Sequence, residues 1–134
     1  MVPMPDKEQF LEEIRDAFGF LLDDGYELLD EYPENPVNAV QLVSSRIIVG
    51  IGLSPRGEFE ITVMRTPGRL ARLFGHRPDE RQERWEYEAM LGSADLGRLL
   101  EIGVEKLRAD PRVLEGDRAY FRGLGEERRR RNGE

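Results

Sequence analysis

The one histidine of the chain, His76, is the first residue to consider for acid–base or nucleophilic chemistry. It lies between Gly75 and Arg77 in a segment rich in arginine, glycine and proline. A histidine base needs a nucleophile and an orienting carboxylate within hydrogen-bond distance, and no spacing in the sequence places them beside His76. The chain has no cysteine, which excludes thiol nucleophiles, disulfides and thiolate metal sites. We therefore expect a surface loop histidine and no catalytic residue.

Carboxylate pairs are the other groups that could do chemistry, and Asp23-Asp24 is the most concentrated pair. It precedes Gly25 at the end of a predicted helix, where negative charge is unfavourable with the helix dipole. Aspartate is also a common turn residue for purely local reasons, and no Asp-x-Asp-x-Asp-Gly calcium loop is present. The sequence therefore predicts no metal site.

Glycine spacing gives no phosphate-binding motif. Gly50-Ile51-Gly52 resembles the start of a dinucleotide fingerprint, but the third glycine position holds Pro55 and no helix follows. Gly52 and Gly57 have the spacing of a phosphate loop, but Glu58 stands where lysine is needed. We expect no bound cofactor.

Charge is distributed unevenly along the chain. Residues 1–64 carry 13 acids and 4 bases, whereas residues 65–134 carry 14 acids and 16 bases. Residues 6–34 alone hold 11 acids against Lys7 and Arg15. Such a surface attracts basic partners and repels phosphate backbones, although a solvated, solubilising face is the simpler explanation. With a net charge of −7, the short basic run Arg128–Arg131 does not predict nucleic-acid or membrane binding.

The length of 134 residues fits a single domain, 1–134. The polar, proline-containing start MVPMPDKE does not resemble a secretory signal, so we expect a cytoplasmic protein. Asp6 and Gln9 have the spacing of a helix cap, and apolar residues follow at helical spacing as far as Leu22. Gly25 ends this helix.

Four strands are expected next, over 26–32, 37–43, 46–53 and 58–64, because apolar and polar residues alternate in them. Their short connections predict an antiparallel meander. Gly50 and Gly52 fall on one face of the third strand, where another group would approach closely.

The segment 66–84 is irregular and contains five arginines, and 85–91 fits either a strand or a helical turn. A helix capped by Ser93 or Asp95 then runs to about residue 109, and a further helix begins at Asp110-Pro111. The tail 126–134 is expected to fray. The predicted class is α+β, with an N-terminal helix, a four-stranded antiparallel meander and C-terminal helices.

Four features precede a leucine-rich helix in the sequence. They are Phe-Gly-Phe-Leu at 18–21, Asp-Asp-Gly-Tyr at 23–26, Asn38 and the alternating segment 46–63. In this order of features, over roughly residues 10–107, the chain resembles small single-domain bacterial immunity-type proteins of toxin neighbourhoods. The resemblance implies a stoichiometric inhibitor that binds a cognate toxin and has no catalytic motif.

We therefore predict a non-enzymatic binding protein, monomeric or homodimeric, whose partner is a basic protein such as a toxin domain. The acids would steer the encounter and nearby exposed tyrosines would anchor the partner. The predicted contact residues are Asp23, Asp24, Tyr26, Glu27, Asp30, Glu31, Tyr32 and Glu34.

Two alternatives remain open. A small enzyme could use a carboxylate pair while the arginine-rich segment 65–84 grips an anionic substrate, which requires a pocket joining the two. A homo-oligomeric structural protein could instead pair the acidic 6–34 surface of one copy with the arginine-rich segment of another.

Overall fold

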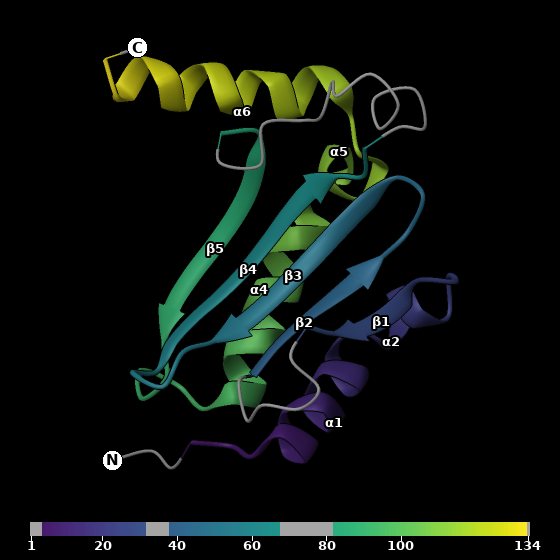
Figure 1. Cartoon of the computed structure of the whole chain (residues 1–134), viewed down its shortest axis with the longest axis vertical. Coiled ribbons are helices and arrows are strands. Elements are labelled where there is room, and N and C mark those ends of the chain that lie inside the picture. The colour runs from purple at the N-terminus through teal and green to yellow at the C-terminus, as the bar shows by residue number, and fades with distance from the viewer. Residues whose placement is uncertain (1–3, 32–37, 68–81, 134) are drawn as a thin grey trace.

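A five-stranded antiparallel sheet forms the middle of the molecule, and helices pack against one of its faces and across one end (Figure 1). The computed structural model describes residues 4–31, 38–67 and 82–133. The elements in chain order are α1 (Lys7–Ala17), α2 (Gly19–Leu22), β1 (Glu27–Asp30), β2 (Asn38–Val43), β3 (Ile47–Leu53), β4 (Glu58–Arg65), β5 (Arg84–Met90), α4 (Leu96–Ala109), α5 (Pro111–Glu115) and α6 (Arg118–Arg131). The predicted α+β class is confirmed. Within the described ranges no helix is long and apolar enough to cross a membrane.

The sheet is a meander in which each strand pairs with the next, in the order β1-β2-β3-β4-β5. The predicted number of strands, four, is corrected to five, because the ambiguous segment 85–91 forms most of β5. Trp85, Tyr87 and Ala89 lie opposite Val63, Ile61 and Phe59 of β4. The local sequence of this segment fits either a strand or a helical turn. Pairing with β4 and partial burial of these side chains make it a strand.

Helix α1 begins as predicted, since Asp6 Oδ1 accepts a hydrogen bond from the amide of Gln9 at 2.8 Å. The predicted helix then divides at Phe18, where the backbone turns to φ −107°, and continues as the short α2. Gly19 follows directly, and glycine is a weak helix former. Gly25 adopts φ +90° after α2, which favours glycine and turns the chain into β1.

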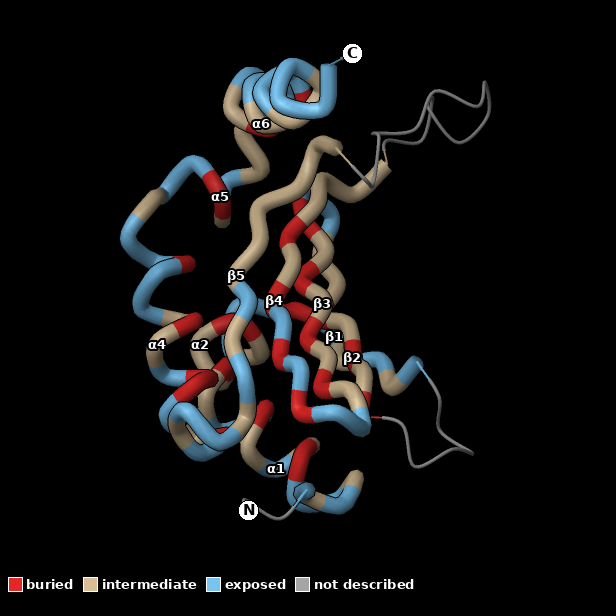
Figure 2. Tube along the Cα trace, turned by 90° about the vertical axis from the view of Figure 1, so that its left-hand side faces the viewer, coloured by how far each residue is buried: buried red, intermediate tan, exposed pale blue. Residues whose placement is uncertain are grey.

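The hydrophobic core lies between the sheet and helices α1, α4 and α5, whereas no described helix covers the opposite face (Figure 2). The largest fully buried side chains are Phe10, Phe18, Phe59, Phe121, Ile14, Leu42, Ile47, Ile51, Ile61, Leu99, Leu100 and Leu107. Gly103 brings α4 close to the sheet, because a Cβ atom there would lie 2.3 Å from Cδ1 of Ile61. The covered face is therefore closely packed.

Gly103→Ala is expected to destabilise the protein by about 1 kcal/mol. Overpacking against Ile61 costs about 1–3 kcal/mol, and the better helix propensity of alanine offsets part of this. Gly123→Ala on α6 is the matched control, because a Cβ at Gly123 meets no atom within 4 Å. Denaturant unfolding should show the control gaining up to about 1 kcal/mol. Equal shifts in both variants would mean that the close approach of α4 has no energetic weight.

The C-terminal part forms three helices where the sequence indicates two. Asp110 caps α5, and Gly116 at φ +66° separates α5 from α6, which Asp117 caps. Where the sequence suggests a frayed tail over 126–134, α6 continues to Arg131. Arg128 donates a hydrogen bond to the carbonyl of Gln82 and its guanidinium lies 3.4 Å from Glu86, so α6 is attached to the end of β5.

Candidate binding surface

Some of the predicted contact residues are exposed to solvent, and others are partly or fully buried. Asp23 and Asp24 are exposed after α2, Glu27 is exposed at the start of β1, and Glu31 is exposed directly after β1. We call these four residues the α2–β1 acidic edge. A basic group already lies beside it, because Arg46 Nη2 is 3.7 Å from Asp24 Oδ2 with both side chains exposed. A pair this exposed contributes little stability. The edge is acidic because its four carboxylates outnumber this one guanidinium.

Asp30 does not belong to this exposed edge. Its carboxylate lies 3.1 Å from Lys7 Nζ, and each of the two side chains is only 20% exposed. The ion pair ties the start of α1 to β1 and neutralises Asp30. Asp30 is therefore a partly buried, ion-paired carboxylate, and its contact with a partner stays a prediction.

Tyr26 was expected to offer an exposed aromatic ring, and this is wrong. Its side chain is 6% exposed and belongs to the core. The amide of Tyr26 donates to the carbonyl of Leu21 at 3.1 Å, which turns the chain back after Gly25 and directs Tyr26 inward. Tyr32, Glu34 and His76 lie outside the described residues, as does most of the arginine-rich segment 65–84.

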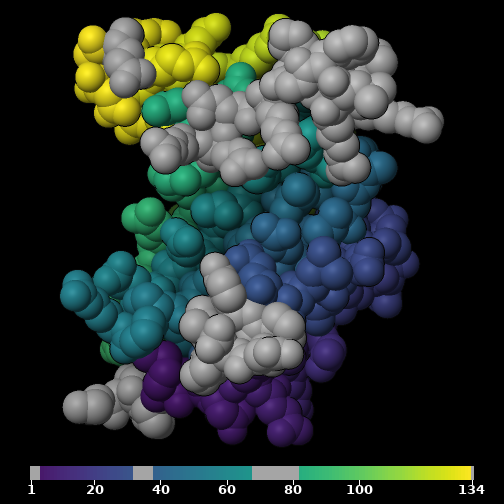
Figure 3. All heavy atoms as spheres, viewed as in Figure 1, coloured from purple at the N-terminus to yellow at the C-terminus, as the bar shows by residue number. Residues whose placement is uncertain are grey.

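The face of the sheet without described helices, which we call the open face, carries the exposed residues of alternate strand positions. Figure 3 looks onto this side of the molecule. One row across it joins Ala39, Gly52, Glu60 and Glu88, which lie opposite one another on β2, β3, β4 and β5. The row at the other end of the sheet is more apolar and joins Val43, Ile48, Met64 and Arg84. The open face is therefore acidic at one end and apolar at the other.

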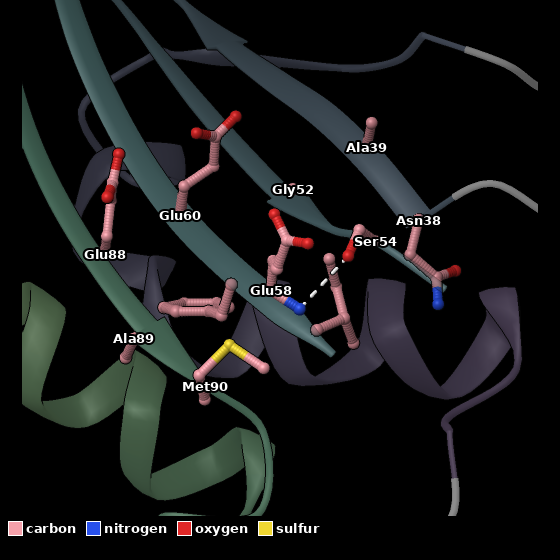
Figure 4. Close-up of a pocket in the computed structure, with 11 residues that line it drawn as sticks. Asn38, Ala39, Gly52, Ser54, Glu58, Glu60, Glu88, Ala89 and Met90 are labelled. Carbon is pink, nitrogen blue, oxygen red and sulfur yellow. Dashed lines mark hydrogen bonds between the residues drawn. The ribbon is translucent and has the colours of Figure 1, made fainter. Parts of the chain in front are cut away.

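A hollow of about 650 Å³ lies at the acidic end of the open face (Figure 4). We call it the glutamate hollow. Its lining includes the small residues Ala39 and Gly52 and the longer side chains Glu58, Glu60, Glu88 and Met90. Because Gly52 has no side chain, the backbone of β3 is partly accessible between the flanking strands.

The charges in the glutamate hollow are unbalanced. Glu60 and Glu88 are directly opposite each other on neighbouring antiparallel strands, an arrangement that is destabilising for like charges. Within the described ranges no basic side chain forms an ion pair with Glu58, Glu60 or Glu88. Glu86 differs, because Arg84 lies 3.1 Å and Arg128 lies 3.4 Å from its carboxylate. The hollow therefore holds three carboxylates with no ion-pair partner among the described residues.

Sequence reasoning missed these three glutamates. Glu58 and Glu60 alternate with core residues of a predicted strand, which is a usable signal, but Glu88 lies in the segment left ambiguous. It also lies in the half of the chain whose charges nearly cancel. Only the β4–β5 pairing brings Glu88 beside Glu60.

A separate charged pair lies at the cap of α5. Asp110 Oδ2 accepts a hydrogen bond from Arg112 Nη2 at 2.7 Å, and this bond lowers the pKa of the Asp110 carboxyl below its ordinary value. Arg112 also stacks over the ring of Tyr120 at 4.3 Å, and burial raises the pKa of Tyr120. These contacts join α5 to α6 and lie apart from the hollow.

The Asp110 contribution to stability should depend on pH. A carboxyl whose pKa is lowered by folding stabilises the protein above its unfolded pKa of about 4, and this contribution is lost as the pH falls through the folded value. Asp110→Asn keeps a capping side chain but removes the charge. Wild type should unfold at a higher temperature than the variant at neutral pH, and the difference should vanish near pH 2. A difference that persists there would show that charge is not its cause.

In the described part of the chain, no three carboxylate or imidazole side chains gather closely enough to hold a metal ion. Comparison with protein-family models, curated proteins and solved structures gave no match. The fold and this surface define an α+β protein with one covered and one uncovered sheet face. Its function is therefore argued from the surface itself.

Proposed function

We propose that this chain is a non-enzymatic, cytoplasmic binding protein of the immunity type, which holds a basic protein such as a toxin domain in a stoichiometric complex. The observation that supports the proposal is the set of exposed carboxylates on the α2–β1 acidic edge. Asp23, Asp24 and Glu27 follow one another within five residues and all reach solvent. Glu31 extends the set along β1, and its amide donates to the carbonyl of Ala39 at 3.1 Å.

The edge has the properties that favour fast association with a basic surface. Exposed charges of one sign raise the encounter rate with an oppositely charged protein, while apolar contacts nearby supply most of the affinity. Leu29, which lies between Glu27 and Glu31, is 41% exposed and offers such a contact in place of the buried Tyr26. Among the described strands β1 is a short edge strand that pairs only with β2, and an edge strand of this kind suits a protein partner.

Affinity capture from the native organism tests this function. Tagged wild type is compared with a variant in which Asp23, Asp24, Glu27 and Glu31 are replaced by lysine, and captured proteins are identified by mass spectrometry. We expect a basic protein that wild type retains and the variant loses. The decisive step uses that protein in purified form, and its own toxic or enzymatic activity should fall to zero at one equivalent of this chain. A captured protein whose activity is unchanged at saturation would contradict the inhibitor function.

A further inference from the structure

We propose that the open face of the sheet is the docking surface for an arginine-bearing segment of the basic partner protein, with the glutamate hollow receiving one arginine side chain. The inference rests on the proposed function and deepens it. It adds a second contact region, on the face of the sheet, to the α2–β1 acidic edge.

The first support is the shape of the surface. Ala39 and Gly52 are the smallest residues in the row of strand partners that also contains Glu60 and Glu88, so the surface is hollowed over them. A Cβ atom at Gly52 would be in ordinary van der Waals contact with Glu60, 3.8 Å from its Cγ and 3.9 Å from its Oε1, so a side chain seated over Gly52 would fit against the Glu60 side chain. Gly50, the neighbouring glycine on this face, differs because a Cβ there would lie 2.9 Å from Thr62 Oγ1. Of these two glycines, Gly52 is therefore the one that leaves room for a side chain of a partner, and it lines the hollow (Figure 4).

The second support is exposed apolar surface. In the described part of the chain the large hydrophobic side chains that are exposed are Met4, Leu29 and Met90. Leu29 lies on β1 opposite Gln41, and Met90 lies on β5 opposite Glu58, so both belong to the open face. They are 41% and 49% exposed. Protein interfaces are enriched in methionine and arginine, so an exposed methionine beside carboxylates suits an arginine-bearing protein segment.

The third support comes from the way the chain already holds an arginine at the neighbouring glutamate. Arg128 of α6 places its guanidinium 3.4 Å from Glu86 and donates to the backbone carbonyl of Gln82. Glu88 is the next residue of β5 on the same face and has no such partner in the described chain, although Glu60 lies opposite it. A guanidinium between Glu60 and Glu88 would replace like-charge repulsion with two charge-assisted hydrogen bonds. Arginine fits better than lysine because its planar fork reaches two carboxylates at once.

The test uses the full chain labelled with ¹⁵N and a blocked pentapeptide, Arg-Val-Arg-Val-Arg, as the probe. We expect amide shifts concentrated at Gly52, Glu58, Glu60 and Glu88, and none of comparable size with the peptide Glu-Val-Glu-Val-Glu. Shifts concentrated on the exposed acids of α1, or spread evenly over all acids, would overturn the proposal. Resonances of the open face that move with protein concentration alone would assign the face to a second copy and would also overturn it.

Two variants separate the hollow from net charge. Glu60→Gln/Glu88→Gln should weaken peptide binding at least about fivefold, whereas the matched pair Glu8→Gln/Glu12→Gln on α1 should change it less than about twofold. Gly52→Val fills the hollow without changing any charge and should weaken binding similarly. Equal effects of the two glutamine pairs, or no effect of Gly52→Val in a folded protein, would overturn the proposal. Each variant is first checked for an unchanged amide spectrum away from the substitution.

The captured partner distinguishes this inference from the proposed function. If lysine substitutions at the α2–β1 acidic edge abolish partner binding but the hollow variants retain it, the docking inference fails and the binding function stands. If no inhibited partner exists but the peptide maps to the hollow, the proposed function fails while the surface remains a site for arginine-bearing segments.

Discussion

Replacing Phe59 with alanine is expected to lower the free energy of unfolding by about 3–5 kcal/mol. Phe59 is 1% exposed, and its ring meets Tyr87 edge to face with centroids 6.2 Å apart. Removing the ring leaves a cavity between β4, β5 and the helices, and it also removes the aromatic contact that helps to hold β5 in the sheet. Denaturant unfolding followed by circular dichroism measures the loss.

Phe20→Ala is the matched control for this prediction. Phe20 is only partly buried, although it stacks on Phe18 with centroids 6.2 Å apart. Its replacement is expected to cost about 1 kcal/mol, the usual size for a site outside the closed core. Similar losses at Phe20 and Phe59 would mean that the core is not centred on the covered face of the sheet.

Phe59 also connects the core to the glutamate hollow. It lies between Glu58 and Glu60 along β4 and faces the opposite side of the sheet, opposite Ala89 of β5. Burial of Phe59 therefore fixes which face these two glutamates occupy, because a slip of one residue would exchange the two faces. The hydrophobic alternation of β4 positions the acidic site as well as the core.

The parts of the fold that could be predicted are those controlled by local sequence. Asp6 and Gln9 are three residues apart, and their cap forms as expected. The alternating residues of 46–53 and 58–64 form β3 and β4 because every second side chain in each is buried. In both cases the residues that carry the signal contact each other within one element or one hairpin.

The parts that could not be predicted depend on distant contacts. β5 contains Glu86 and Glu88 on one side and Trp85 and Tyr87 on the other, and only its pairing with β4 makes this alternation meaningful. Asp30 is neutralised by Lys7, which is 23 residues away in the chain. A count of acids along the sequence therefore points to residues 6–34 and overlooks the glutamates that β4 and β5 bring together.

Reversing the charges of the α2–β1 acidic edge should slow association with the basic partner by about 10–100-fold at low salt. The variant carries Asp23→Lys, Asp24→Lys, Glu27→Lys and Glu31→Lys. Asp30 is kept, since its ion pair with Lys7 supports the fold. Stopped-flow mixing with the purified partner gives the association rate constant. The difference from wild type should nearly disappear at about 1 M salt, where the Debye length falls to about 3 Å.

A second variant with the same change in net charge shows whether the position of these acids matters. It reverses Glu101, Glu105, Glu126 and Glu127, which are exposed and lie on α4 and α6. If the edge steers the partner, this control should slow association less than about threefold at about 0.1 M salt, where the Debye length is about 10 Å and charges farther than that from the contact are largely screened. Equal slowing in both variants would mean that overall charge, rather than a defined surface, attracts the partner. The dissociation rate should change little in the control, since the residues that would hold the bound partner, Leu29 and the glutamate hollow, are intact.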